Sequence, residues 1–179
     1  MKILKNKLKN ELNIRTEKDY PIKGIEFIDM TPLIMQKETL KEILDQFEER
    51  LKNKEIDYIV APEARGFLLG TAIADRLQIG CIPVRKKGKL PPSTVENRFQ
   101  YEKEYGKDEM ELPKLVKNTY ENKKFYLVDD IYATGNTMKA IQKAIERVGG
   151  EIIGKGVIMN ITALNKEKDV FSLLEVEEE

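Results

Sequence analysis

The apolar residues of this chain alternate between helical spacing and short unbroken runs. From Lys37 to Lys52 they fall three and four positions apart, as on one face of an α-helix. Further helices are predicted from the turn at 62–66 to about Leu77, and from about Thr137 to Val148. Buried strands are predicted at four short apolar runs, 58–61, 81–84, 125–128 and 152–161. Strands that alternate with helices predict an α/β fold: a twisted, mainly parallel β-sheet with helices on both faces.

Two segments fall outside this alternation. Near the N-terminus, apolar residues at helical spacing among lysines predict an amphipathic helix packed on its own protein; they are Ile3, Leu4, Leu8 and Leu12. Residues 85–106 are basic, carry Pro and Gly at their start, and are otherwise polar with interspersed aromatic residues. Loops of this length are uncommon in compact domains, and we expect a functional lid or a disordered loop here.

Composition narrows the class of protein. The chain has 179 residues, which suits one domain, and its 31 basic and 31 acidic residues give a formal net charge of zero. Its basic stretches are short and are offset by acidic ones, so we expect no nucleic-acid partner. No uninterrupted apolar segment predicts a signal peptide or a membrane span, and we expect a soluble, cytoplasmic protein.

The side chains available for chemistry are restricted. Cys81 is the only cysteine, so no intrachain disulfide can form, and the chain contains no histidine. Histidine-dependent triads and histidine-ligated metal sites are therefore excluded. Carboxylates, Lys, Arg, Tyr, hydroxyls and backbone amides remain, and Mg²⁺ remains possible because it takes oxygen ligands.

The segment from Asp129 to Thr137 has the pattern of a phosphate-binding turn. A predicted strand ends in two acids, and a helix begins a few residues later, where its unpaired amides favour an anion. Gly135 lets the backbone approach a ligand closely, and Thr134 and Thr137 add hydroxyls. The two acids would repel a phosphate but suit the hydroxyls of a ribose. An ordinary helix N-cap is the alternative interpretation of the same pattern.

This segment resembles the signature with which type I phosphoribosyltransferases bind phosphoribosyl pyrophosphate (PRPP). Three further motifs occur in the order and at the spacing of the adenine-specific branch of that family. They are Glu63-Ala64-Arg65-Gly66-Phe67-Leu68, Arg85-Lys86-Lys87-Gly88-Lys89-Leu90-Pro91 and Glu104-Tyr105-Gly106. The resemblance spans nearly the whole chain. It implies a single domain over 1–179, with a small hood from about 1–35 and the C-terminal part, and a flexible lid at about 85–110.

The resemblance also implies a reaction, transfer of phosphoribosyl from PRPP to a purine base, and a role for each cluster. Asp129 and Asp130 would hold the ribose, and the 5′-phosphate would lie on Ala133, Thr134, Gly135, Asn136 and Thr137. The pyrophosphate would be bound by Arg65, Arg85, Lys86 and Lys89. Glu104, Tyr105 and Arg65 would be catalytic, with Glu104 handling the proton at the base. The base would be sandwiched between Phe27 and Ile161 and read by the backbone around Glu26 and Ile28.

Three further features follow from the resemblance alone. Mg²⁺ would accompany PRPP and be held mainly by PRPP and water, without a dedicated protein metal site. The protein would be a homodimer in which Arg85 or its neighbours complete the partner's site. A non-proline cis peptide would occur near Glu63-Ala64.

The sequence departs from the family pattern at four positions: Glu26, Ile28, Lys103 and Asn136. The changes at 26, 28 and 103 leave another purine base open as the substrate in place of adenine. Asn136 replaces a glycine, and Asn tolerates left-handed backbone angles better than most residues. The remaining alternative is a PRPP-sensing regulator without catalysis. Such a protein would be expected to carry an added DNA-binding module, for which this chain has no room.

Overall fold

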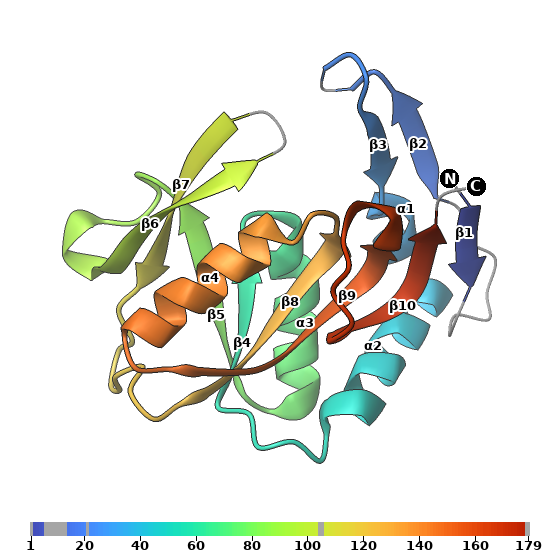
Figure 1. Cartoon of the computed structure of the whole chain (residues 1–179). Coiled ribbons are helices and arrows are strands. Elements are labelled where there is room, and N and C mark those ends of the chain that lie inside the picture. Colours follow the sequence, from blue (N-terminus) through green and yellow to red (C-terminus); the bar gives the residue numbers. More distant parts are fainter. Residues whose placement is uncertain (1, 6–13, 21, 104–105, 178–179) are drawn as a thin grey trace.

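The computed structural model of the protein describes residues 2–5, 14–20, 22–103 and 106–177 (Figure 1). One eight-stranded sheet has the order β1-β10-β9-β8-β4-β5-β7-β6. The strands are β1 (Lys2–Lys5), β4 (Tyr58–Pro62), β5 (Gly80–Lys86), β6 (Val95–Lys103), β7 (Gly106–Pro113), β8 (Lys124–Tyr132), β9 (Glu151–Ile161) and β10 (Val170–Glu177). The five central strands, β10 to β5 in this order, are parallel, and the three outer strands pair antiparallel. The predicted mainly parallel α/β sheet is therefore confirmed.

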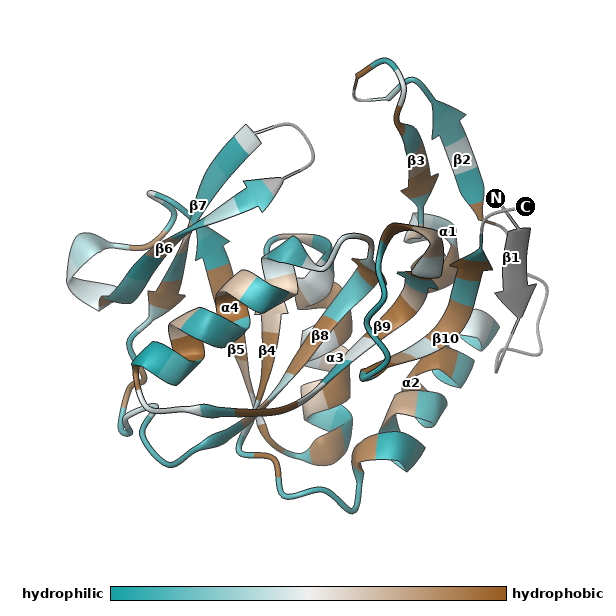
Figure 2. Ribbon diagram, in the orientation of Figure 1, coloured by the Kyte–Doolittle hydropathy of each residue, from teal (hydrophilic) through white to brown (hydrophobic). Residues whose placement is uncertain are grey.

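Helices cover both faces of this sheet. The side chains of β8 alternate between the faces: Tyr126 and Val128 pack in the cluster that holds α2 (Lys37–Leu51) and α3 (Arg65–Leu77). Phe125 and Leu127 pack in the cluster that holds α4 (Asn136–Arg147). Because β8 is buried on both faces, it reads in sequence as an unbroken apolar run. Figure 2 shows the apolar strands between helices that turn polar faces outward.

The N-terminal helix prediction is wrong for the described residues 2–5. They form β1, which pairs antiparallel with β10, with Ile3 opposite Val176. The rest of the predicted helix, including Leu8 and Leu12, lies outside the described residues. Strand β10 was not predicted either. The pairing of these two strands is a contact between opposite ends of the chain, and local apolar spacing carries no information about it.

Of the two alternatives for residues 85–106, the disordered loop is wrong for the described residues, and the lid stays a prediction. Strand β5 continues to Lys86, a short 3₁₀ turn follows at Pro92–Thr94, and β6 and β7 form an antiparallel hairpin. Phe99 pairs with Met110, and both side chains are buried. On β6, buried aromatic residues alternate with exposed polar ones, the period-two pattern of a half-buried strand. That alternation was the signal in the sequence for this hairpin.

A second, two-stranded sheet stands apart from the main one. It pairs β2 (Arg15–Lys18) with β3 (Glu26–Asp29), and the short helix α1 (Thr31–Met35) follows. Another 3₁₀ turn, Thr162–Leu164, lies between β9 and β10. Figure 1 shows the β2–β3 and β6–β7 hairpins rising on either side of the edge at which the parallel strands end. The two hairpins thus flank the carboxyl edge of the sheet.

Candidate functional site

The strand order places a topological switch point between β4 and β8. From β4 the chain crosses through α3 to β5 on one side, whereas β8 lies on the other side of β4. In open parallel sheets, ligands bind beside such a point, at the carboxyl ends of the strands. The residues that follow β4 and those that end β8 are therefore the candidate site.

An ion pair joins the two strands at this point. Arg65 begins α3 directly after β4, and its Nε lies 2.8 Å from Oδ2 of Asp130 on β8. The Asp130 side chain is almost completely buried, yet within the described residues Oδ2 has no aligned hydrogen bond. A buried carboxylate oxygen normally has hydrogen-bond partners. Asp130 Oδ2 is thus held at the switch point by the charge of Arg65, with capacity left to accept an aligned hydrogen bond.

The neighbouring carboxylate, Asp129, contacts the backbone of the same strand. Its Oδ1 accepts the backbone N–H of Asp130 at 2.8 Å. A Cβ at Gly66 would lie 3.0 Å from Asp129 Oδ1, so only glycine leaves room beside this oxygen. Burial, and secondly the charge of Asp130, raise the pKa of Asp129 well above its usual 3.8. Asp129 therefore favours its protonated form more strongly than an ordinary aspartate does.

The raised pKa of Asp129 has a consequence for stability. A folded-state pKa above the unfolded value means that ionisation of this group opposes folding as pH rises from 3.8 through the folded-state pKa. We expect Asp129→Asn to be more stable than the native protein at pH 7. The difference should shrink as pH falls through the folded-state pKa and vanish below 3.8. Urea unfolding midpoints from pH 4 to pH 8 measure it.

Asp57 provides the control with the opposite sign. Its carboxylate accepts the Lys124 backbone N–H at 2.8 Å, and this bond helps to hold the pKa of Asp57 below its usual value. Asp57→Asn should therefore destabilise the protein at pH 7. A native protein as stable as Asp129→Asn at every pH would contradict the raised pKa.

The turn after β8 has the backbone of an anion cradle. Gly135 precedes α4 with a φ of 79°, and the first amides of the helix point along its axis, out of its N-terminus, into this turn. A Cβ at Gly135 would lie 2.1 Å from the Tyr132 hydroxyl oxygen, so the Tyr132 ring underlies the turn. Ala133, Thr134 and Thr137 are partly exposed. Asn136 begins α4 without a positive φ, so its replacement of a glycine requires no left-handed backbone.

The structure also shows a residue that the sequence reasoning missed. Asn165 follows the 3₁₀ turn after β9, and its amide nitrogen lies 2.8 Å from the carbonyl oxygen of Ala133 and 2.9 Å from that of Ile161. It also donates to Oδ1 of Asn160. One side chain therefore fixes the start of the anion cradle to the end of β9. Nothing in the local sequence marks Asn165 as a site residue, because its contact with Ala133 spans 32 residues and forms only on folding.

The β2–β3 hairpin reaches the same site through Phe27. The Arg65 guanidinium lies 5.4 Å from the centre of the Phe27 ring, close enough for a cation–π contact. Tyr20 packs against the Phe27 ring in an edge-to-face pair, with ring centroids 5.3 Å apart. Arg65 therefore contacts both Asp130 and Phe27, which joins the hairpin to the switch point.

The other predicted base-binding residues differ in exposure. Ile28 and Ile161 are both buried in the core cluster on the α2–α3 face, whereas Glu26 is exposed. The side chain of Ile28 is thus engaged in packing, which leaves its backbone as the part available to a ligand. Ile161 ends β9 next to the anion cradle, through the shared contact of Asn165.

Apart from Arg65, the residues predicted to bind pyrophosphate lie on β5 and just after it. Arg85 Nε donates to Glu63 Oε2 at 3.0 Å, and its guanidinium lies 5.8 Å from the centre of the Phe67 ring. The side chains of Lys86 and Lys89 are exposed. The Glu63–Ala64 peptide between β4 and Arg65 is cis, as the resemblance implied. Glu63 therefore holds Arg85 beside the turn that presents Arg65.

Glu104 and Tyr105 lie outside the described residues, at the junction of β6 and β7. In the rest of the chain, no group of three or more Cys, Asp or Glu side chains is arranged to hold a metal ion. None of the described helices is both long and apolar enough to cross a membrane.

The sheet order, the cis turn before Arg65, the acid pair and the anion cradle together have the architecture of the type I phosphoribosyltransferases. The family model of the phosphoribosyl transferase domain matches residues 34–178. An adenine phosphoribosyltransferase of Clostridium perfringens is 45% identical over 151 residues, which are 84% of this chain and 86% of that protein. The chain belongs to the phosphoribosyltransferase family, and within it to the adenine phosphoribosyltransferases.

Solved structures agree with this assignment. The adenine phosphoribosyltransferase of Thermoanaerobacter pseudethanolicus superposes with a TM-score of 0.81 at 36% identity, covering 92% of this chain and 95% of that one. The enzyme of Saccharomyces cerevisiae superposes with a TM-score of 0.77 at 32% identity, covering 89% and 93%. That structure contains adenine and D-2,5-dideoxy-2,5-imino-altritol 1,6-bisphosphate.

Proposed function

We propose that this protein is a purine salvage enzyme that transfers phosphoribosyl from PRPP to adenine and releases AMP and pyrophosphate. The observation that supports the site best is the buried Asp130 oxygen, paired with Arg65 and lacking an aligned hydrogen bond, beside the anion cradle. The choice of adenine rests on the relatives, which are adenine phosphoribosyltransferases at up to 45% identity. A base nitrogen would attack the anomeric carbon as the bond to pyrophosphate breaks.

The phosphorylated ribose would lie across the end of β8. Vicinal ribose hydroxyls can donate to the carboxylates of Asp129 and Asp130. The 5′-phosphate would accept hydrogen bonds from the backbone amides of residues 133–137 and from the two threonine hydroxyls. The N-terminus of α4 adds a favourable dipole to these contacts. Each group thus meets a partner of complementary chemistry.

The pyrophosphate would be bound by Arg65, Arg85, Lys86 and Lys89. The planar guanidinium of an arginine can donate to two phosphate oxygens at once, whereas a lysine supplies a compact charge. In this proposal Mg²⁺ is held mainly by PRPP oxygens and water, and it neutralises charge on the leaving pyrophosphate. The carboxylates of Asp129 and Asp130 suit such a cation, because it prefers oxygen ligands.

Rate acceleration would come from positioning and charge stabilisation, since an oxocarbenium-like transition state needs no protein nucleophile. Glu104 would handle the proton at the base, beside Tyr105. The β6–β7 hairpin is the lid in this proposal, and its closure would exclude water from PRPP. The β2–β3 hairpin is the hood. The base would lie between Phe27 and Ile161, with its edge read by the backbone around Glu26 and Ile28.

A single assay tests this function. The protein is incubated with PRPP and Mg²⁺, and separately with adenine, hypoxanthine, guanine or xanthine, and each nucleotide formed is identified. We expect AMP from adenine at the highest rate. A higher rate with another base would reassign the substrate, and PRPP binding without any nucleotide would favour a sensing regulator. The reducing cytoplasm is the proposed location, where the one thiol, Cys81, stays unpaired.

We further propose that the enzyme is a homodimer in which the basic segment around Arg85 completes the partner's site. A pyrophosphate carries more negative charge than one short loop can easily neutralise, and a two-fold interface brings the same segment from both subunits. Mixing two inactive variants, Arg85→Ala and Asp129→Ala, should then restore activity. One of the two sites in each heterodimer would contain neither change.

The control for this mixture is Asp129→Ala with Asp130→Ala, which change the same side of the site and should not complement each other. Sedimentation should show a dimer at micromolar concentration. A monomer there, or no restored activity for the first pair, would contradict the shared site.

A further inference from the structure

A groove lies between α4 and the β6–β7 hairpin. Its volume is about 380 Å³, within the range of small-molecule sites, which begins at about 300 Å³. One wall is formed by α4 and the other by β6 and the start of β7. Its lining consists of Phe99, Gln100, Tyr101, Glu102, Lys107, Asn136, Lys139, Ala140, Lys143 and Arg147. Of the residues proposed to bind substrate, only Asn136, at the end of the 5′-phosphate cradle, lines it.

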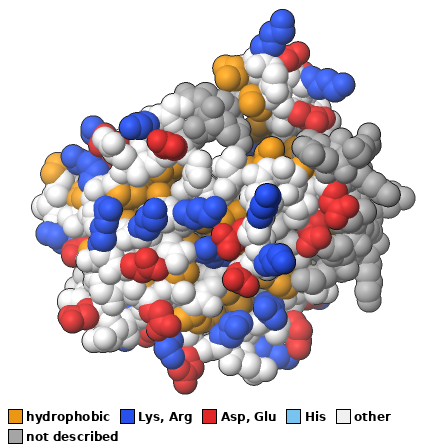
Figure 3. Space-filling model, in the orientation of Figure 1, with side chains coloured by type: hydrophobic (Ala, Val, Ile, Leu, Met, Phe, Trp, Pro, Cys, Tyr) orange, Lys and Arg blue, Asp and Glu red, His pale blue; other side chains and the backbone are white. Residues whose placement is uncertain are grey.

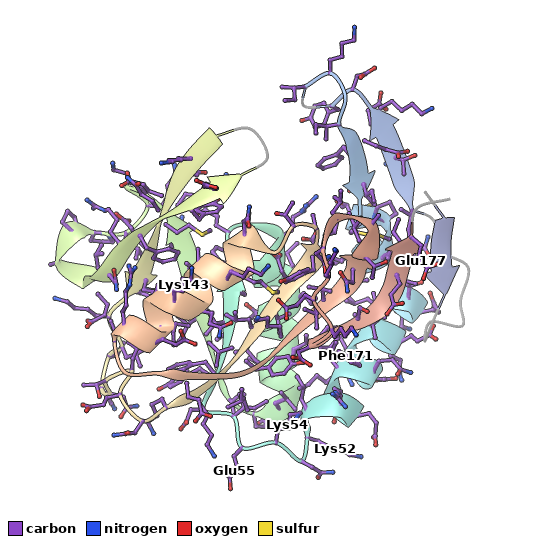
Figure 4. All side chains as sticks on the ribbon, in the orientation of Figure 1. Lys52, Lys54, Glu55, Lys143, Phe171 and Glu177 are labelled. Atoms are coloured by element: carbon purple, nitrogen blue, oxygen red, sulfur yellow. The ribbon has the colours of Figure 1, made fainter. Side chains whose placement is uncertain are left out.

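The charge of this groove is strongly positive although the chain as a whole has a net charge of zero. Four of its lining residues are cationic and one, Glu102, is anionic. Lys139, Lys143 and Arg147 follow one another four residues apart on α4, so they share one face of the helix. Lys107 faces them from the hairpin. Figure 3 shows a row of Lys and Arg side chains crossing the region of α4, and Figure 4 places Lys143 on that helix.

These cations have little compensation from the protein. Lys139 is 3.9 Å from Glu167, at the limit of an ion pair. Between described residues, no ion pair involves Lys107, Lys143 or Arg147. By contrast, Arg85 and Arg98 at the neighbouring strands are each paired with a carboxylate. Like charges held on two facing walls repel, and an anion between them would remove that repulsion.

The spacing of the cations along α4 indicates how long the bound anion must be. Eight residues of an α-helix rise about 12 Å, so Lys139 and Arg147 are separated by about that distance along α4. A single phosphate cannot contact both ends of such a row, whereas a chain of phosphates can. The aromatic side chains of Phe99 and Tyr101 are buried, so they offer no open face on which a base could stack. The groove therefore favours phosphates over a nucleobase.

We propose that this groove is a second anion site, which binds a small ligand carrying a chain of phosphate groups. Because its walls belong to α4 and to the hairpin, the bound anion bridges the two elements. Its four cations, Lys107, Lys139, Lys143 and Arg147, are not among the proposed catalytic or substrate-binding residues. The ligand would act on the position of the hairpin, the proposed lid, rather than on the reacting atoms.

Calorimetric titration of the whole protein with inorganic tripolyphosphate tests this proposal. The variant Lys143→Gln/Arg147→Gln removes two charges from the groove, and Lys37→Gln/Lys117→Gln removes two exposed charges elsewhere. AMP in excess fills the proposed base, ribose and 5′-phosphate sites, and Arg85→Gln, introduced into every protein titrated, weakens the proposed pyrophosphate site. The groove variant should then bind tripolyphosphate at least about tenfold more weakly than its parent. The control variant should bind like its parent. Without Arg85→Gln, both variants should form AMP at the native rate when no tripolyphosphate is present.

Two further titrations identify the ligand. Orthophosphate should bind much more weakly than tripolyphosphate, since it cannot span the row. ATP compared with tripolyphosphate distinguishes a nucleotide, which would bind more tightly, from an inorganic phosphate chain, which would bind equally well. Unchanged affinity in the groove variant, or equal weakening in both variants, would overturn the site. Tighter binding of a single-stranded RNA oligonucleotide, lost in the same groove variant, would assign the surface to nucleic acid instead.

If the protein has no transferase activity, these titrations without AMP still measure the groove, because the comparison is between matched variants. Failure of the proposed function and failure of the second site are thus distinguishable. Slower backbone hydrogen exchange in residues 95–103 with tripolyphosphate, in the native protein only, is the expected sign of bridging.

Discussion

Gly135→Ala is expected to reduce phosphoribosyl transfer by a hundredfold or more. The added Cβ would lie 2.1 Å from the Tyr132 hydroxyl oxygen and 2.3 Å from its Cζ, far inside contact distance. Tyr132 is buried, with 1% of its surface exposed, so its ring cannot move into solvent. Overpacking of this kind costs about 1–3 kcal/mol, and the φ of 79° adds strain for any residue with a Cβ. The backbone of the cradle must therefore shift, and its amides would no longer point toward the proposed 5′-phosphate position.

Gly24→Ala is the matched control for this effect. Gly24, between β2 and β3, also has a positive φ, 91°, but an added Cβ would meet nothing within 4 Å. It therefore reports the strain of the backbone alone. AMP formation and thermal unfolding are measured for both variants. If the two lose activity equally, the contact with Tyr132 is not the cause, and if Gly135→Ala is fully active, the cradle does not bind the 5′-phosphate.

Asp130→Asn is expected to lower turnover by roughly ten- to hundredfold while the fold is kept. The side chain keeps its shape, but the amide no longer offers a charged acceptor at the position where the structure leaves Oδ2 without an aligned hydrogen bond. Hydrogen bonds to charged groups contribute about 1.5–3 kcal/mol, and 1.4 kcal/mol corresponds to about tenfold. The loss of charge also removes the ion pair with Arg65. Steady-state kinetics with varied PRPP measure the change.

Asp45→Asn separates this effect from the general loss of an ion pair. Asp45 also lies 2.8 Å from an arginine, Arg76, but between α2 and α3 and away from the switch point. Its replacement should leave turnover unchanged. Native turnover in Asp130→Asn would remove the ribose role proposed for that residue.

Several parts of the site were predicted from the sequence because each lies within one short segment. The strand, the two acids and the turn of 125–137 are continuous in the chain, and β8 and α4 form where their apolar pattern predicted. The α2 helix begins and ends within one residue of its prediction, because a single amphipathic face defines it. The family motifs indicated which residues belong to the candidate site without any structural information.

Other parts depend on contacts between distant segments. Strand β1 pairs with β10 at the opposite end of the chain. Asn165 meets Ala133 across 32 residues. Such contacts follow from the packing of the whole sheet, and a local window contains no trace of them.

The sequence by itself determined the class of fold, the family and the set of candidate side chains, since apolar period and motif spacing are local properties. Only the tertiary structure decided that Arg65 contacts both Asp130 and Phe27, that Arg85 is held by Glu63, and that four cations face one groove. The physical reason is the same in each case. Distances between side chains of different strands are set by sheet order and packing, and the charge of a surface is set by which residues folding brings together.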